Sequence, residues 1–246
     1  SANYSAGDRI TYALSLVNTG TAAITDYTVT DNLGGYTVGA NTVYPLAYNA
    51  GTVRYYINGV LQTPPTVTAG PPLTVTGLTV PAGGSAVLIY ETTATPVAPL
   101  ATGSSITNTA TITGGGLTTP ITAQATVETA NSADLTISKA LSPTTVTENG
   151  QITYTFVISN TGNTEATATG NVVVTDTFAP ILRNIAVTYN GTAWTEGTNY
   201  TYNAATGVFT TLAGQITVPA ASFTQNTDGT FTVTPGTATL VITGTV

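Results

Sequence analysis

The chain contains the same series of short motifs twice, in the same order. Ile10-Thr11-Tyr12 recurs as Ile152-Thr153-Tyr154, and Asn-Thr-Gly follows eight residues later in both copies, at Asn18 and Asn160. Three further pairs are Val29-Thr30-Asp31 with Val174-Thr175-Asp176, Val80-Pro81-Ala82 with Val218-Pro219-Ala220, and Val87-Leu88-Ile89 with Leu240-Val241-Ile242. Such a tandem duplication constrains the chain to two domains that share one fold.

The residues around these motifs predict β-strands. Apolar residues occupy alternate positions at Ile10, Tyr12, Leu14 and Leu16, and again at Ile152, Tyr154, Phe156 and Ile158. This period of two is typical of a half-buried strand, and Gly in the following Asn-Thr-Gly suits a tight turn. No stretch has a sustained helical period. We therefore expect an all-β chain of two tandem immunoglobulin-like antiparallel β-sandwiches with almost no helix.

The sequence places the domain boundary near residue 130. Residues 128–132 are polar and linker-like, and Leu135, Ile137 and Lys139 follow as the first strand of the second copy. Nothing before Ser5 matches that strand, and the chain ends before any second-copy counterpart of 106–112. We predict that domain 1–130 lacks its first strand and that domain 131–246 lacks its last strands.

The composition argues against several classes of function. The chain has no His and no Cys, and its net charge is −7 with four basic residues, which are Arg9, Arg54, Lys139 and Arg183. Scattered cations do not neutralise a phosphate backbone, so we expect no nucleic-acid partner. We also expect no membrane insertion, no cofactor, no metal site and no enzymatic activity, because the acids are dispersed and no catalytic motif is present.

The motifs of the second copy resemble a known family of repeats. Asp134-Leu135-Thr136-Ile137-Ser138-Lys139 precedes Gly150-Gln151-Ile152-Thr153-Tyr154, and Val174-Thr175-Asp176-Thr177 follows. In the first copy, Ile106-Thr107-Asn108-Thr109-Ala110-Thr111-Ile112 has the pattern of a late strand of that family. The chain resembles the immunoglobulin-like repeat domain of unknown function found in bacterial and archaeal cell-surface proteins. The resemblance implies an extracellular location, at the cell surface or in a surface appendage.

The two missing strands allow two interpretations. One is that the chain is a fragment of a longer array of repeats. The other is a structural subunit of a fibre or stalk, assembled by strand complementation with identical subunits or adjacent repeats. The matched deficits at opposite ends favour the second interpretation. The alternative function is an adhesin that binds a host protein or glycan.

Four residues are candidates for a covalent crosslink. In surface domains of the collagen-adhesin type, a first-strand Lys joins a last-strand Asn through an isopeptide bond promoted by a buried acid. Here Lys139 and Asp176 stand in the second copy, whereas Asp31 and Asn108 stand in the first. The residues of one crosslinking site are thus divided between the two copies. One hypothesis is that Lys139 forms a bond to a neighbouring chain. On sequence alone we favour the simpler alternative, a solvated lysine and turn-capping aspartates.

Aromatic residues offer one further candidate site. Tyr55, Tyr56, Trp194, Tyr200 and Tyr202 could form a platform for stacking on sugars. Tyr residues at alternate positions of a strand are more often packed in a core or an interface. We therefore favour packing.

Overall fold

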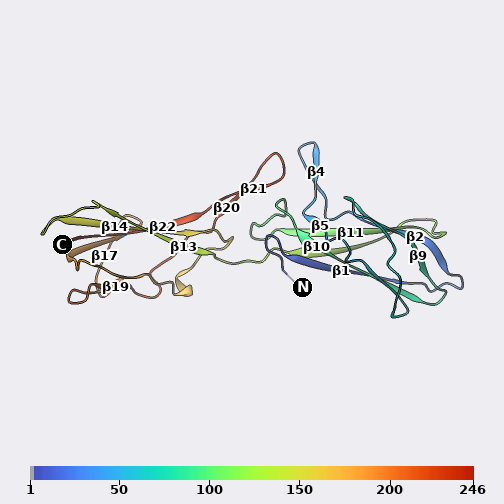
Figure 1. Ribbon diagram of the computed structural model, residues 1–246, viewed down its shortest axis with the longest axis horizontal. Helices are drawn as coiled ribbons and strands as arrows, with labels where there is room; N and C mark the ends of the chain where they lie inside the picture. The colour runs from blue at the N-terminus through green and yellow to red at the C-terminus, as the bar shows by residue number, and fades with distance from the viewer. Residues whose placement is uncertain (1–2) are drawn as a thin grey trace. The chain divides into compact units, whose positions relative to one another are not determined.

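The computed structural model describes residues 3–246 and contains 22 β-strands and one 3₁₀ turn, at Ala168–Gly170 (Figure 1). This confirms the prediction of an all-β, antiparallel, immunoglobulin-like chain. The chain divides into two compact units. Unit 1 comprises the chain through Ala130 together with Thr224–Thr232, and unit 2 comprises Asn131–Phe223 and Val233–Val246. Within the described residues, no helix is long and apolar enough to cross a membrane.

Unit 1 is a sandwich of two antiparallel sheets. One sheet has the order β1 (Arg9–Val17), β10 (Ser85–Ala94), β6 (Arg54–Ile57), β7 (Val60–Leu61), and β5 (Leu46–Tyr48) also pairs with β10. The other sheet has the order β12 (Ile121–Glu128), β11 (Ser105–Gly114), β2 (Ile24–Asp31), β9 (Leu73–Val80), β8 (Thr66–Thr68). A separate hairpin joins β3 (Tyr36–Val38) to β4 (Asn41–Val43).

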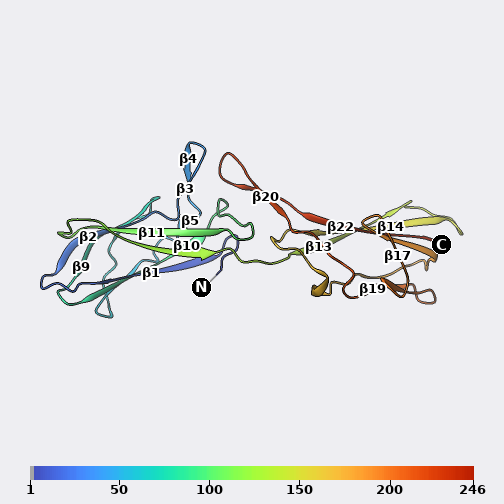
Figure 2. The same cartoon turned by 180° about the vertical axis from the view of Figure 1, so that it is seen from behind.

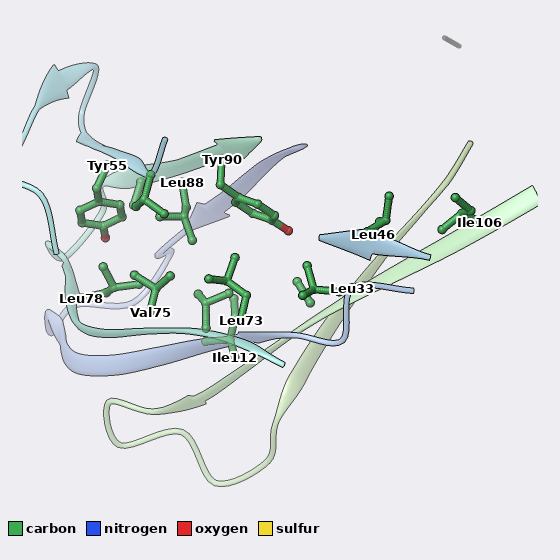
Figure 3. Packing of buried hydrophobic residues seen from close by; sticks show 14 of the residues in the cluster. Leu33, Leu46, Tyr55, Leu73, Val75, Leu78, Leu88, Tyr90, Ile106 and Ile112 are labelled. Atoms are coloured by element: carbon green, nitrogen blue, oxygen red, sulfur yellow. The ribbon is translucent and has the colours of Figure 1, made fainter. Parts of the chain in front are cut away.

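The core of unit 1 lies between these sheets. Figure 3 shows Tyr55, Leu88 and Tyr90 of one sheet pointing toward Leu73, Val75, Leu78 and Ile112 of the other. In β10, alternate residues Ala86, Leu88 and Tyr90 are buried, as the period-two pattern requires. The hydroxyl of Tyr55 reaches across to the Thr79 carbonyl at 2.6 Å and contacts the Tyr27 hydroxyl at 2.7 Å, so these buried polar atoms are satisfied.

Unit 2 repeats this plan with fewer strands. Its larger sheet has the order β13 (Leu135–Ser142), β14 (Gln151–Asn160), β22 (Gly236–Thr245), β16 (Arg183–Tyr189), β17 (Thr192–Trp194) (Figure 2). Its smaller sheet has the order β15 (Thr175–Thr177), β19 (Val208–Thr211), β18 (Tyr200–Asn203). β20 (Ser222–Gln225) and β21 (Phe231–Thr234) form a hairpin that begins and ends in unit 2, whereas its residues Thr224–Thr232 belong to unit 1. Ile152, Tyr154, Phe156 and Ile158 of β14 are all buried, as their alternation predicts.

The repeated motifs make the same contacts in both units. Asn18 and Asn160 are buried, and each donates from Nδ2 to a carbonyl four residues ahead and to the carbonyl of a distant proline, Pro81 or Pro219. Each side-chain oxygen accepts from the amide of the glycine in the same Asn-Thr-Gly. The Asn160 contacts therefore pin the end of β14 to Pro219, in the segment between β19 (Val208–Thr211) and β20 (Ser222–Gln225).

One strand is shorter than the sequence indicates. The β-branched residues at 172–175, Val-Val-Val-Thr, favour a strand there, but β15 covers only Thr175–Thr177. The Val174 backbone bonds to Thr211 instead, through Thr211 Oγ1 and the Thr211 amide at 2.9 Å each. In unit 1 the matching strand β2 pairs on both sides, with β11 and β9. β15 pairs with β19 alone, so its ladder has less support.

Candidate functional site: two open edges and a divided polar cluster

Strand β1 forms an open edge of unit 1. Within residues 3–246 it pairs with β10 only, whereas its repeat counterpart β14 lies between β13 and β22. The Asn18 amide donates to Gly84 across the β1–β10 pair, so the amides of even-numbered β1 residues face β10. The amides of Thr11, Ala13 and Ser15 therefore point away from β10, toward the vacant side. A strand can add there by main-chain hydrogen bonds.

Strand β15 forms the open edge of unit 2. Asp31 of β2 is paired with Leu73 of β9 on one side and with Ala110 of β11 on the other. The equivalent Asp176 is paired with Phe209 of β19, and in the described residues no strand pairs with its other side. The strands that unit 2 lacks are thus the counterparts of β11 and β12, which unit 1 contains.

Lys139 lies beside Asp176 in unit 2. Its Nζ is 2.5 Å from Asp176 Oδ2, and the lysine side chain is 40% exposed. The ammonium also lies over three aromatic rings, with centroid distances of 4.8 Å to Tyr154, 5.6 Å to Phe156 and 5.7 Å to Phe178. Such contacts stabilise a cation. The lysine remains solvent-exposed, and it is also paired with Asp176, because β13 points this side chain toward the core side of β14.

Asp31 and Asn108 lie together in unit 1. Asn108 Nδ2 donates to Asp31 Oδ2 at 2.9 Å, and the Tyr90 hydroxyl donates to the same oxygen. Asp31 Oδ1 accepts from the Leu33 amide at 2.7 Å, which is the turn-capping contact that the sequence indicates. The Gly34 amide donates to Asn108 Oδ1 at 3.1 Å. Both side chains are buried, with exposed fractions of 1% and 3%.

The Asp31 carboxyl lies in an environment that favours its neutral form. Burial raises the pKa of Asp31, and the hydrogen bonds from Tyr90, the Leu33 amide and Asn108 offset this only in part. Burial, followed by the neighbouring Asp31 charge, also raises the pKa of Tyr90. A protonated carboxyl beside a primary amide can donate a proton to the amide nitrogen.

A cavity of about 80 Å³ adjoins this cluster. Its walls come from both sheets, with Tyr12 and Leu14 on β1, Asp31 and Tyr90 within, and Asn108 on β11. Ala123 and Ala125 of β12 complete the wall, and their small side chains leave the space open. Tyr12 Oη is buried and has no hydrogen-bond partner in the described part of the chain. The cavity thus presents an unsatisfied hydroxyl to any polar group that enters it.

Strands β12 and β13 are both exposed along nearly their whole length. In β12 only Val127 is buried, and in β13 only Leu135 is even partly buried. Both strands nevertheless carry apolar residues on the side that faces the core. These are Ile121, Ala123, Ala125 and Val127 on β12, in register with buried β11 residues, and Leu135, Ile137 and Leu141 on β13, on the side of Lys139. Each unit therefore lacks the strand that would cover this face.

Four of the five aromatic candidates, Tyr55, Trp194, Tyr200 and Tyr202, take part in core packing, and Tyr56 is half-buried on β6. Tyr55 and Tyr200 are buried, and Trp194 stacks on Tyr189 with ring centroids 4.8 Å apart. Sequence reasoning missed three members of the unit 1 cluster, Tyr12, Tyr90 and Gly34. Tyr12 and Tyr90 gave no separate signal because they belong to alternating strand patterns. Gly34 has φ +69°, and a Cβ there would lie 2.7 Å from Ile106, so only glycine lets this amide approach Asn108.

The environment of Asp31 predicts a pH dependence of stability. Because its pKa is raised on folding, the folded unit 1 binds this proton more tightly than the unfolded chain does. This contribution to stability is complete below the unfolded pKa of about 4 and is lost as pH rises through the folded pKa. We expect the melting temperature of unit 1, relative to the Asp31→Asn variant, to fall as pH increases from 4 to 8.

Differential scanning calorimetry measures this difference. The unit 1 transition is the one that Trp194 fluorescence does not follow, because the single tryptophan of the chain lies in unit 2. Asp8→Asn serves as a matched control at an exposed aspartate of unit 1. Parallel pH profiles of the wild type and Asp31→Asn would contradict the prediction.

Comparison with known proteins adds distant structural likenesses only. No protein-family model matches the chain, and no curated protein matches it in sequence. It is similar to BcpA, the major pilin subunit of Bacillus cereus, with a TM-score of 0.35 and 14% identity over 94% of this chain and 60% of BcpA. It is also similar to RrgB, the pilus backbone of Streptococcus pneumoniae, with a TM-score of 0.32 and 13% identity over 95% of this chain and 49% of RrgB.

A third likeness is to the type II cohesin dyad of the adaptor ScaA scaffoldin from Acetivibrio cellulolyticus. Its TM-score is 0.26 and its identity 11%, over 100% of this chain and 82% of the dyad. The chain spans less than two thirds of the length of either pilin chain. These scores and identities are too low to assign the chain to a family or to an activity.

Proposed function

We propose that the chain is a structural, non-enzymatic subunit of an extracellular fibre or stalk, assembled by strand complementation between repeats. The observation that carries this proposal is the pair of open edges, β1 in unit 1 and β15 in unit 2. The strand absent beside β1 is the one that unit 2 has as β13, and the strands absent beside β15 are those that unit 1 has as β11 and β12. Copies of the chain thus carry the strands that other copies lack.

The proposal also accounts for the exposed apolar residues beside these edges. A long strand edge with unpaired amides and an apolar flank is a site for pairing with another chain unless it is blocked. Charged or proline residues commonly block such edges, but β1 carries only Arg9, at its start. We place the protein at the cell surface or in a surface appendage, as a member of the immunoglobulin-like repeat domains of cell-surface proteins.

The adhesin alternative has less support. It relied on an exposed aromatic platform, but Tyr55 and Tyr200 belong to the cores and Trp194 packs on Tyr189. An adhesin would behave as an isolated rod rather than as a filament.

Blocking the β1 edge tests the proposal. The Ser15 amide points away from β10, so Ser15→Pro removes one donor for an added strand without removing a β1–β10 hydrogen bond. We expect the wild-type protein to form filaments at high concentration by negative-stain electron microscopy. We expect Ser15→Pro to form none and to remain monomeric by light scattering.

Ser15→Thr is the matched control, because it keeps the amide and should form filaments as the wild type does. Circular dichroism and the melting temperature establish that Ser15→Pro is folded. Isolated wild-type rods at all concentrations would overturn the proposal, and so would filaments of Ser15→Pro equal to those of the wild type.

A further inference from the structure

The Lys139–Asp176 pair of unit 2 and the Asp31–Asn108 pair of unit 1 occupy equivalent positions in the two repeats. Together they contain the groups of one crosslinking site. Phe156, opposite Lys139 in the β13–β14 pair, occupies the repeat position of Leu14 in β1. Tyr154 below the ammonium corresponds to Tyr12, and Asp176 beside it corresponds to Asp31. A strand that paired with β1 in the register of β13 would therefore place its lysine opposite Leu14, over Tyr12 and toward Asp31.

The cavity of unit 1 lies at this predicted lysine position. It is lined by Tyr12, Leu14, Asp31 and Asn108, the groups that the equivalent lysine would meet. In unit 2 the amine is 2.5 Å from Asp176 Oδ2, and in unit 1 the Asn108 amide nitrogen is 2.9 Å from Asp31 Oδ2. The Asp31 carboxyl group would thus contact both the incoming amine and the Asn108 amide. The unsatisfied Tyr12 hydroxyl provides one more polar contact for the amine.

The Asn108 amide is arranged for attack by an amine. The Gly34 amide donates to Asn108 Oδ1, where negative charge develops when a nucleophile adds to the Asn108 Cγ. Asp31 contacts the Asn108 nitrogen, which must be protonated to leave as ammonia. Both groups are buried, which strengthens these interactions relative to water. Unit 1 thus contains the acceptor, the acid and the oxyanion donor, and lacks only the amine.

The chain itself carries a strand with the required amine. β13 has the chain's only lysine, Lys139, flanked on the same face by Ile137 and Leu141, which are 54% and 43% exposed. The uncovered face of β12 is lined by Ile121, Ala123 and Ala125, so the two apolar faces would cover each other. β13 buries little apolar surface in its own unit, so its removal from β14 exposes little. Pairing with β1 of another copy would replace the main-chain hydrogen bonds to β14 with equivalent ones.

We propose that β13 of a second copy adds to the open edge of β1 and that its Lys139 forms an amide bond with Asn108. This inference rests on the proposed assembly by strand complementation and identifies its partner and its chemistry. The neutral Lys139 amine adds to Asn108 Cγ, and Asp31 takes a proton from Nζ and delivers one to Nδ2. The Cγ–Nδ2 bond breaks, the Cγ–Nζ bond remains, and ammonia leaves. No oxidant or further reactant takes part in the step.

The crosslink is tested on the full chain by mass. Concentrated wild-type protein should give ladders that resist boiling in detergent, and each link should lower the summed mass by one ammonia. Peptide sequencing by mass spectrometry should join Lys139 to Asn108. Lys139→Arg and Asn108→Ala should each give no ladder. A mixture of these two variants should give only a dimer, because one supplies the acceptor and the other supplies the amine.

A second experiment tests the chemistry without relying on whether the Asn108→Ala variant folds. The Lys139→Arg chain keeps the unit 1 cluster intact, so a synthetic peptide of residues 134–142 should attach to it with loss of one ammonia. The same peptide with norleucine in place of lysine should not attach. Absence of the peptide adduct overturns the proposed chemistry. A wild-type monomer whose mass is lower by one ammonia, with no multimers present, overturns the assignment of the bond to a second copy. Wild-type filaments that dissolve fully in detergent would refute the crosslink while leaving strand complementation in place.

Discussion

Replacement of Asn160 by alanine is expected to lower the free energy of unfolding of unit 2 by about 3–4 kcal/mol. Asn160 is fully buried and donates to the Thr164 carbonyl at 2.8 Å and to the Pro219 carbonyl at 3.0 Å. Its oxygen accepts from the amides of Gly162 and Asp134. Alanine would leave these backbone groups without partners where water cannot readily replace the side chain. The loss therefore exceeds that of a single hydrogen bond.

Urea denaturation monitored by Trp194 fluorescence measures this loss in unit 2 alone. Trp194 stacks on Tyr189, so its emission should change when that contact is lost. Gln151→Ala, at an exposed position of the same strand, should change stability by less than about 0.5 kcal/mol. An Asn160→Ala midpoint equal to that of Gln151→Ala would show that the buried asparagine has no such role.

Replacement of Phe178 by alanine is expected to destabilise unit 2 by about 3–5 kcal/mol. The Phe178 side chain is 1% exposed, and its ring lies 4.8 Å from that of Tyr154 and 6.2 Å from that of Phe209. It is also one of the rings beneath the Lys139 ammonium. Truncation would open a cavity between the two sheets and remove one of the aromatic contacts of the lysine.

Phe178→Leu separates these two effects. Leucine refills most of the cavity, so its loss should be about 1–2 kcal/mol, while it still removes the aromatic face. The same tryptophan-monitored denaturation compares the variants. Equal losses for alanine and leucine would mean that cavity formation does not dominate the energetics at this position.

The sequence correctly predicted the secondary structure because the fold depends on local patterns. Alternation in Ile152, Tyr154, Phe156 and Ile158 gives a buried face wherever a strand meets an apolar layer, and the structure buries all four. The Asn-Gly pairs at Asn58 and Asn190 have positive φ and begin tight hairpins, as their residue types require. The three valines at 172–174 did not join a ladder, although their residue type favours a strand, because β15 has a partner strand on one side only.

The sequence could not assemble the polar cluster. Asp31 and Asn108 are 77 residues apart, and their contact depends on the pairing of β2 with β11. Burial of Asp31, the approach of Gly34 and the Tyr90 hydroxyl all arise from how the two sheets pack. The surroundings of Lys139 also could not be predicted from the sequence. A lysine is normally solvated, and only its position on β13 places the ammonium over three aromatic rings.

The duplication that the sequence displays thus determined that the chain has two similar β-sandwiches, and the unmatched motifs at 106–112 and 134–139 indicated which strands differ between them. Only the tertiary structure decided that the vacant edge of β1 adjoins a cavity lined by Asp31 and Asn108. Strand propensity depends on neighbours along the chain, whereas an edge, a cavity and a buried acid depend on long-range pairing and packing.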